Sequence, residues 1–140
     1  MKATLLALFI TLMAAITCLA QDSTNTSDSS GVITVSIVKL LASPEKYHQK
    51  KVQVIGYFRY DGSVRNIFLH KEDADSSVFT NSFWTFFSKS ISYTYQKELH
   101  NQYVIIEGIF DMNNKGPIHM YGGAITEISR LDPWKINALN

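Results

Sequence analysis

Cysteine is almost absent from the 140 residues, since Cys18 is the only one. It lies within an apolar N-terminal run, so a disulfide framework is excluded for the rest of the chain. Zinc sites commonly combine His and Cys at short spacings. The four histidines are widely separated, at His48, His70, His100 and His119. We therefore expect a domain that has no disulfide and no metal site.

An excess of basic side chains is also missing. The whole chain has 13 Lys and Arg residues and 12 Asp and Glu residues. Lys2 is the only charged residue among the first twenty, so residues 21–140 carry 12 basic and 12 acidic side chains. Proteins that bind nucleic acid usually show a basic excess, because neutralising phosphates supplies most of their affinity. A nucleic-acid partner is thus disfavoured, although the overall charge does not exclude a local basic patch.

The motifs of common catalytic sites are missing as well. There is no Gly-x-Ser-x-Gly elbow, and the stretch "GYFRYDG" lacks the Gly-Lys-Ser/Thr ending of a phosphate loop. The acidic stretch "HKEDADSS" does not have the ligand spacing of a calcium loop, so we interpret residues 70–77 as a polar loop between strands. We expect neither catalysis nor a cofactor.

The N-terminus is typical of an exported protein. Lys2 precedes an uncharged apolar run that ends near Ala20, which predicts a secretory signal peptide over residues 1–20. Residues 21–31 are rich in Ser, Thr, Asn and Asp and predict a disordered linker. The mature chain then has no transmembrane helix and is periplasmic or secreted. A lipid anchor at Cys18 is the alternative, although Thr17 is an unusual residue before a lipidated cysteine.

The hydrophobic period changes along the rest of the chain. Apolar residues at helical spacing predict helices over about 35–42 and from Ser90 or Ser92 to about 101. Alternation predicts five strands. They cover residues 51–60, 64–70, 78–88, 102–112 and 118–131, the last one bent at Gly122-Gly123.

Two of these strands carry a glycine at the same place. "VQVIGYF" and "VIIEGIF" put Gly56 and Gly108 in the middle of a strand, where glycine marks a bulge or a tight bend. Five strands with a helix between the third and the fourth follow the order of the OB-fold. We therefore predict a mainly β protein, a five-stranded OB-fold Greek-key barrel with an N-terminal helix and a helix between strands 3 and 4. The domain would span residues 32–134, with a C-terminal tail over 135–140.

Several segments resemble one group of proteins. They are "SIVKLLASPEKY", "KKVQVIGYF", "IFLHKEDAD", "YVIIEGIFD" and "GGAITEISRLDPW". From Val35 to Trp134 the chain is similar to small bacterial exported OB-fold proteins of unassigned function. The resemblance implies the fold and leaves the function open.

Aromatic residues offer the best indication of a binding surface. Trp84 and Phe86 share one face of the third predicted strand, and Phe83 and Phe87 share the other. One face must fill the core, and the sequence leaves open which one. OB-folds bind their ligands on the face of strands 2 and 3, between the loops that join strands 1–2 and 4–5. On that map the candidate ligand-binding residues are Tyr57, Arg59, Tyr60, Arg65, Phe68, Lys115, His119 and Tyr121.

Taken together, these features predict a non-catalytic binding module of the cell envelope. Its unassigned ligand would be a protein, a peptide or a glycan. The first alternative is an OB-fold that binds single-stranded nucleic acid. The second is a metal-binding or enzymatic protein.

Overall fold

A computed structural model of the chain describes residues 31–135. The predicted signal peptide, Cys18, nearly all of the predicted linker and the C-terminal tail beyond residue 135 lie outside these residues. Within them, no helix is long and apolar enough to cross a membrane.

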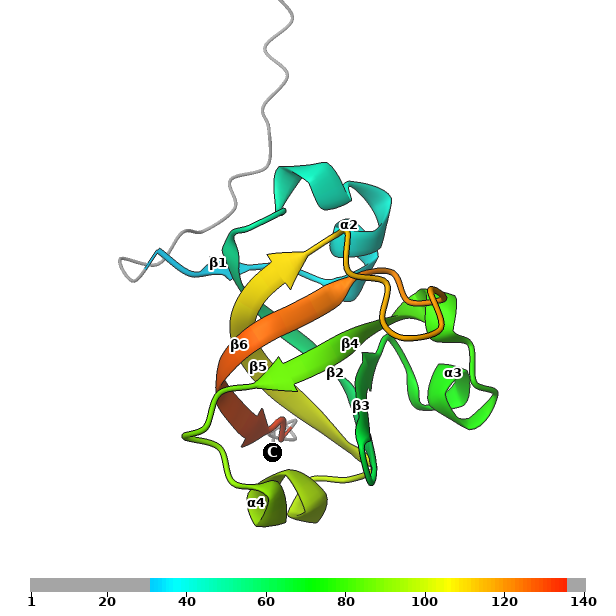
Figure 1. The fold of residues 1–140 in the computed structure, drawn as a ribbon, viewed down its shortest axis with the longest axis vertical. Coiled ribbons are helices and arrows are strands. Elements are labelled where there is room, and N and C mark those ends of the chain that lie inside the picture. The colour runs from blue at the N-terminus through cyan, green and yellow to red at the C-terminus, as the bar shows by residue number, and fades with distance from the viewer. Residues whose placement is uncertain (1–30, 136–140) are drawn as a thin grey trace, which may run out of the picture.

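The described part of the chain is mainly β, as predicted, with short helices (Figure 1). Six strands form one mixed sheet with the order β1-β2-β3-β4-β6-β5. The strands are β1 (Ile33–Thr34), β2 (Lys51–Asp61), β3 (Val64–Phe68), β4 (Ser82–Phe87), β5 (Gln102–Asp111) and β6 (Ala124–Pro133). β2 also pairs with β5, so the pairing runs from β2 through β3, β4, β6 and β5 back to β2. The β1–β2 and β4–β6 pairs are parallel, and the other pairs are antiparallel.

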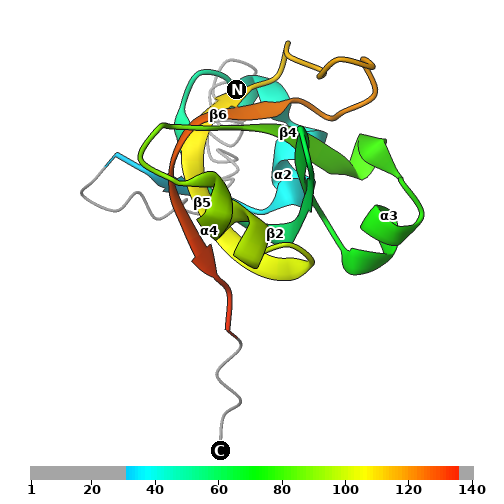
Figure 2. The same cartoon turned by 60° about the horizontal axis from the view of Figure 1, so that its bottom comes forward.

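The short helices lie around the strands (Figures 1 and 2). They are α2 (Ile37–Ala42), η1 (Pro44–Lys46), α3 (Lys71–Asp75), η2 (Phe79–Asn81) and α4 (Tyr93–Glu98). Serine side chains begin two of them, because Ser36 Oγ accepts a hydrogen bond from Lys39 N and Ser92 Oγ accepts one from Tyr95 N. α2 buries Ile37 and Leu40. α4 lies at the opposite end of the strands from α2 (Figure 1).

The alternation along the strands separates a core from an outer surface. In β2, Val52, Val54 and Phe58 point inward and are almost fully buried. Phe83 of β4 and Phe110 of β5 meet them from other strands, with their rings 5.4 Å apart at an angle of 81°. The core is thus built from inward-facing residues of every long strand.

Gly56 and Gly108 lie inside β2 and β5 at places where no side chain fits. A Cβ at Gly56 would lie 2.7 Å from the Phe68 carbonyl oxygen and 2.6 Å from Cγ1 of Ile67. A Cβ at Gly108 would lie 2.6 Å from the Thr126 carbonyl oxygen, next to a register shift between β5 and β6. Both glycines therefore let a neighbouring backbone approach closely.

Polar side chains join three strands on the outer surface. Gln53 Nε2 of β2 donates to Glu107 Oε1 of β5 at 2.8 Å, and Arg130 of β6 donates to the same oxygen at 2.8 Å. Arg130 Nε also donates to Asp132 at 2.6 Å. The hydrogen bond from Arg130 is the main reason why the pKa of the Glu107 carboxyl lies below its usual value.

The structure corrects several predicted elements. Residues 71–75 of the predicted polar loop form α3, which buries Ala74. The third predicted strand begins at Ser82 and not at residue 78, because η2 precedes it. The last strand begins at Ala124 and continues to Pro133, so residues 118–123 belong to the preceding loop. β1 was not predicted, and it makes the sheet six-stranded where five strands were expected.

We predict that Gly56→Ala and Gly108→Ala each lower the free energy of unfolding by at least about 2 kcal/mol, because the added methyl group meets backbone that cannot yield. Urea unfolding followed by tryptophan fluorescence measures the change. Gly62→Ala is the control, since Gly62 has a φ of +59° but no atom within 4 Å of a Cβ. It should cost only about 1 kcal/mol, from the left-handed backbone alone. Equal losses in all three variants would contradict the close-approach explanation.

A second prediction concerns pH. Because the folded-state pKa of Glu107 is lowered, its stabilisation is present above the unfolded-state value of 4.5 and is lost as the pH falls through the folded-state value. Glu107→Gln should destabilise the protein at neutral pH by less than about 1 kcal/mol, since Arg130 is well exposed. The difference from the native chain should shrink as the pH falls below 4.5 and vanish once Glu107 is protonated in the folded state as well. Glu127→Gln, at an exposed position of β6 where the change removes no ion pair among residues 31–135, is the control for the substitution itself.

Candidate functional site

The outer surface of β2, β3 and β4 carries the candidate site. Register places Arg59 of β2 opposite Asn66 of β3, and Asn66 opposite Trp84 of β4. These three side chains therefore point to the same side of the sheet, away from Phe58 and Phe83 in the core. The sequence left open which face of β4 fills the core, and the structure shows that Phe83 does so while Trp84 and Phe86 lie outside.

The segment between β3 and β4 folds over part of this outer surface. Its residues Ala74 and Phe79 pack on Tyr57 and Phe68 to form a second apolar cluster, separate from the core. Asn81 Nδ2 donates to Asp73 Oδ1 at 3.0 Å, and Ser82 Oγ donates to the Phe79 carbonyl at 2.7 Å. These hydrogen bonds tie η2 to α3 and to the start of β4, so the ring of Phe79 is held in place.

Five aromatic rings form a continuous row on this surface. Successive ring centroids are 6.1 Å apart from Phe68 to Phe79, 5.3 Å from Phe79 to Tyr121, 5.3 Å from Tyr121 to Trp84 and 6.1 Å from Trp84 to Phe86. We call these five residues the aromatic face. Exposure varies along the row, because Phe68 and Tyr121 are buried, Phe79 and Trp84 are half-buried and Phe86 is 43% exposed. A ligand can therefore reach Phe79, Trp84 and Phe86.

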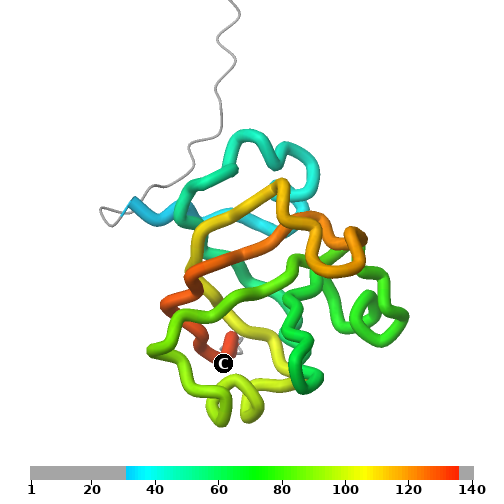
Figure 3. Tube along the Cα trace, viewed as in Figure 1, coloured from blue at the N-terminus to red at the C-terminus, as the bar shows by residue number. Residues whose placement is uncertain are grey.

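The loop over residues 112–123 supplies Tyr121 and lies beside η2 (Figure 3). Gly122 N donates to the Ser82 carbonyl at 2.9 Å, and Lys115 Nζ donates to the Gly122 carbonyl at 2.7 Å. Gly116 has a φ of +70°, and a Cβ there would lie 2.8 Å from Cε2 of Tyr121. The loop can therefore fold against the Tyr121 ring only because residue 116 has no side chain.

A small pocket of about 160 Å³ opens beside the aromatic face, and we call it the Asn66 pocket. Arg59 and Asp61 line it from β2, Val64 and Asn66 from β3, and Ser77 and Phe79 from the segment before β4. The Arg59 guanidinium donates to the Ala74 carbonyl, which holds it against α3. The pocket thus contains one basic and one acidic side chain beside an aromatic ring.

Asn66 is the unusual member of this pocket. It is only 3% exposed, and its Nδ2 donates to Tyr121 Oη at 3.2 Å. Its Oδ1 is buried and accepts no hydrogen bond from any described residue. An unsatisfied buried acceptor costs about 1–3 kcal/mol of stability. Burial also raises the pKa of the Tyr121 phenol, while the hydrogen bond from Asn66 lowers it in part.

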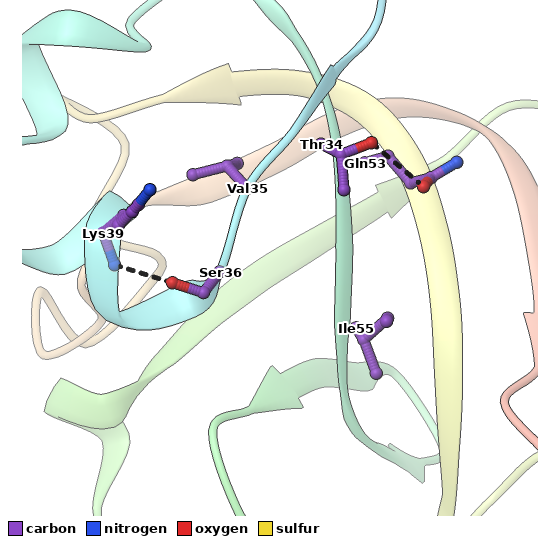
Figure 4. A pocket seen from close by; sticks show the side chains of 6 residues that line it. All are labelled: Thr34, Val35, Ser36, Lys39, Gln53 and Ile55. Carbon is purple, nitrogen blue, oxygen red and sulfur yellow. Dashed lines mark hydrogen bonds between the residues drawn. The ribbon is translucent and has the colours of Figure 1, made fainter. Parts of the chain in front are cut away.

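Two other hollows clarify what is special about the Asn66 pocket. One lies between β1, α2 and β2 (Figure 4), where Ser36 accepts from Lys39 N and Thr34 Oγ1 donates to Gln53 Oε1 at 3.3 Å. The polar side chains drawn there thus have partners within the protein, apart from the Lys39 ammonium at its rim. The other, of about 560 Å³, adjoins Phe86 and is lined by Asn114 and Glu127. The aromatic face therefore runs from the Asn66 pocket, at Phe68 and Phe79, to the hollow at Phe86.

The structure divides the predicted site residues into two groups. Tyr57, Arg59, Phe68 and Tyr121 lie on the outer surface, although the Tyr57, Phe68 and Tyr121 side chains are mostly covered. Lys115 is bound within the loop, and His119 is exposed on it with a φ of +54°.

Tyr60 and Arg65 belong to the other side of the sheet. Tyr60 packs against the core, and Arg65 NH1 donates to Gln96 Oε1 of α4 at 3.3 Å. The Arg65 guanidinium also lies 5.4 Å from the ring centroid of Tyr93. Tyr60 and Arg65 are paired in the register of β2 and β3, so both lie on the side of the sheet away from the aromatic face.

Sequence reasoning did not select Asp61, Asn66, Phe79, Trp84 and Phe86 as site residues. Trp84 and Phe86 were visible as a pair on one face of a strand, and only the choice of face was missing. Asn66 gave no signal, because a polar residue between Arg65 and Ile67 fits an exposed strand position equally well. Among residues 31–135, no group of three or more His, Cys, Asp or Glu residues is placed to hold a metal ion.

Comparison with known proteins gives no family. No family model matches the chain, and no curated protein matches it. Among solved structures, a protein assigned as an aspartyl-tRNA synthetase from Leishmania major Friedlin is similar, with 12% identity and a TM-score of 0.46 over 81% of this chain. This chain spans 22% of that protein's length. OBody AM3L15, solved bound to hen egg-white lysozyme, is similar with 16% identity and a TM-score of 0.41, over 64% of this chain and 85% of its own. Both scores are below 0.5, so neither likeness bears on the function.

Proposed function

We propose that residues 32–134 form an OB-fold that acts as a non-catalytic binding module of the cell envelope. The cyclic pairing of β2, β3, β4, β6 and β5 supports the fold, because an OB-fold is a partly open five-stranded barrel. The helix α4 between β4 and β5 also has the position expected from the sequence. β1 is then an addition at the edge of β2.

The aromatic face is the observation that carries the binding function. Its rings lie on β3 and β4 and on the segments next to them, where an OB-fold presents its ligand surface. Ile118 and Met120, in the loop that carries Tyr121, are also about half exposed. Exposed apolar side chains that gather in one place mark a binding surface more often than single ones do.

Export is proposed from the N-terminal sequence. A signal peptide over residues 1–20, as in the small bacterial exported proteins that the chain resembles, brings the domain to the periplasm or the medium. The ligand classes present there are envelope proteins, peptides and glycans. Basic and acidic side chains are equal in number in residues 21–140, which agrees with a partner of this kind.

The binding function predicts a specific effect of Phe86→Ala. Loss of one stacking ring should weaken binding at least about fivefold, since such a ring contributes about 1–3 kcal/mol. The probes are a glycan array, a phage-displayed peptide library and an oligothymidine, with affinities then measured by calorimetry. Trp134→Ala is the matched control, because Trp134 is also 43% exposed but lies at the end of β6. Binding to no probe, or equal effects of the two variants, would contradict the proposal.

Single-stranded nucleic acid is the second candidate, because the exposed rings of the aromatic face would also stack on bases. Arg59 and Lys115 lie near that face, although each already donates to a backbone carbonyl. If this candidate holds, the logarithm of the association constant for oligothymidine falls linearly with the logarithm of salt concentration. Absence of oligothymidine binding at low salt rejects it.

A further inference from the structure

We infer that the Asn66 pocket binds one sugar unit of a neutral glycan, whose neighbouring units lie along the aromatic face. This inference rests on the proposed binding function and specifies its ligand.

The size of the pocket sets the first limit. Whole small-molecule sites usually measure about 300–1,000 Å³. The Asn66 pocket holds about 160 Å³, which suits a single ring-sized unit. Phe79 and Phe68 line the pocket and also begin the row of rings, so a unit bound here is continuous with the aromatic face. The second hollow at Phe86 extends the same path at its far end.

Asn66 determines the polar chemistry. Asn66 lines the pocket, and its buried Oδ1 accepts no hydrogen bond from residues 31–135, so a ligand hydroxyl toward which the amide turns would supply the missing partner. If the Asn66 amide were turned over, its oxygen would accept from the Tyr121 hydroxyl and its nitrogen would be the atom without a partner among residues 31–135. The amide would then need an acceptor in place of a donor. A hydroxyl group both donates and accepts, so it satisfies Asn66 in either orientation.

The charges of the pocket favour a neutral ligand. Arg59 and Asp61 lie two residues apart on the same side of β2, and they bring one positive and one negative charge to the wall. An anion would face Asp61 and a cation would face Arg59, at a cost in either case. Hydroxyl groups donate to Asp61 and accept from Arg59 or Ser77 without adding a charge.

The aromatic lining accounts for the remaining surface. The C–H groups on one side of a sugar ring form an apolar patch, and Phe79 is a half-buried ring at the pocket that such a patch can cover. Trp84 and Phe86 then offer the same kind of contact to the next units. A peptide side chain would fill the pocket as well, but a neutral apolar one would leave Asn66 unsatisfied.

The test compares four probes that differ in charge and substituents. Cellotetraose and tetra-N-acetylchitotetraose are neutral, the deacetylated chitosan tetramer is cationic, and tetragalacturonic acid is anionic. A broader glycan array is run with the same protein. We expect a neutral glycan to bind at least tenfold more tightly than the charged tetramers. Binding of no neutral glycan, or equal binding of charged and neutral ones, overturns the inference.

Two variants test the pocket itself. Asn66→Leu removes the unsatisfied amide and should weaken binding of the neutral glycan at least tenfold. Because Asn66 is buried, Val64→Trp is the second variant, which fills the pocket from an exposed position of β3. Val38→Trp adds the same bulk at an exposed position of α2 and is the control. Glycan binding that neither pocket variant weakens overturns the inference.

The outcomes separate this inference from the proposed function. In one outcome, a peptide or another probe binds, Phe86→Ala weakens that binding, and neutral glycans do not bind. The proposed binding function is then supported, and the assignment of a glycan ligand is wrong. If glycan binding is insensitive to Phe86→Ala, the proposed function fails at the aromatic face.

Discussion

The pairing of β2 with two strands at once is the constraint on which the rest of the structure depends. β2 pairs with β5 over residues 51–58 and with β3 over residues 57–61. The two ladders overlap at Tyr57 and Phe58, directly after Gly56. At that point the Phe68 carbonyl and the tips of Ile67 and Ile37 occupy the space of a side chain. A glycine in β2 is therefore what allows β3 and α2 to close over the core.

The outer surface follows from this inner arrangement. Once Phe58, Ile67 and Phe83 are buried inside, the alternation of the strands forces Arg59, Asn66 and Trp84 to the outside. The bare sheet is then partly covered by the segment between β3 and β4, which buries Phe68 and leaves Phe86 exposed. Partial cover creates a pocket at one end of the row of rings, where a fully covered or fully open sheet would have none.

The sequence predicts those features that depend on local periodicity. The alternation in "KVQVIGYF" and "YVIIEGIF" predicts β2 and β5, and Ser92, one of the two serines predicted to begin the later helix, is the N-cap of α4. Periodicity fails where a segment folds against distant residues. The stretch "IHMYGG" alternates like a strand but forms a loop, because Tyr121 packs on Gly116 and Phe79. In α4, Tyr95 is 37% exposed, whereas the polar residue Gln96 is buried, at 1% exposure. Gln96 accepts a hydrogen bond from Arg65 and donates one to the Ile91 carbonyl.

Asn66 shows why the site itself cannot be found by such reasoning. Its burial depends on Tyr121, which is 55 residues away in the chain, and the position of Tyr121 depends in turn on the open space at Gly116. The Tyr121 ring also joins Phe79 to Trp84, so one side chain both occupies the Asn66 nitrogen and completes the row of rings. Because the Tyr121 hydroxyl occupies the nitrogen, the Asn66 oxygen is left without a partner among residues 31–135. The polarity of the pocket and the continuity of the aromatic face are therefore set together by the loop before β6, and a change in that loop alters both.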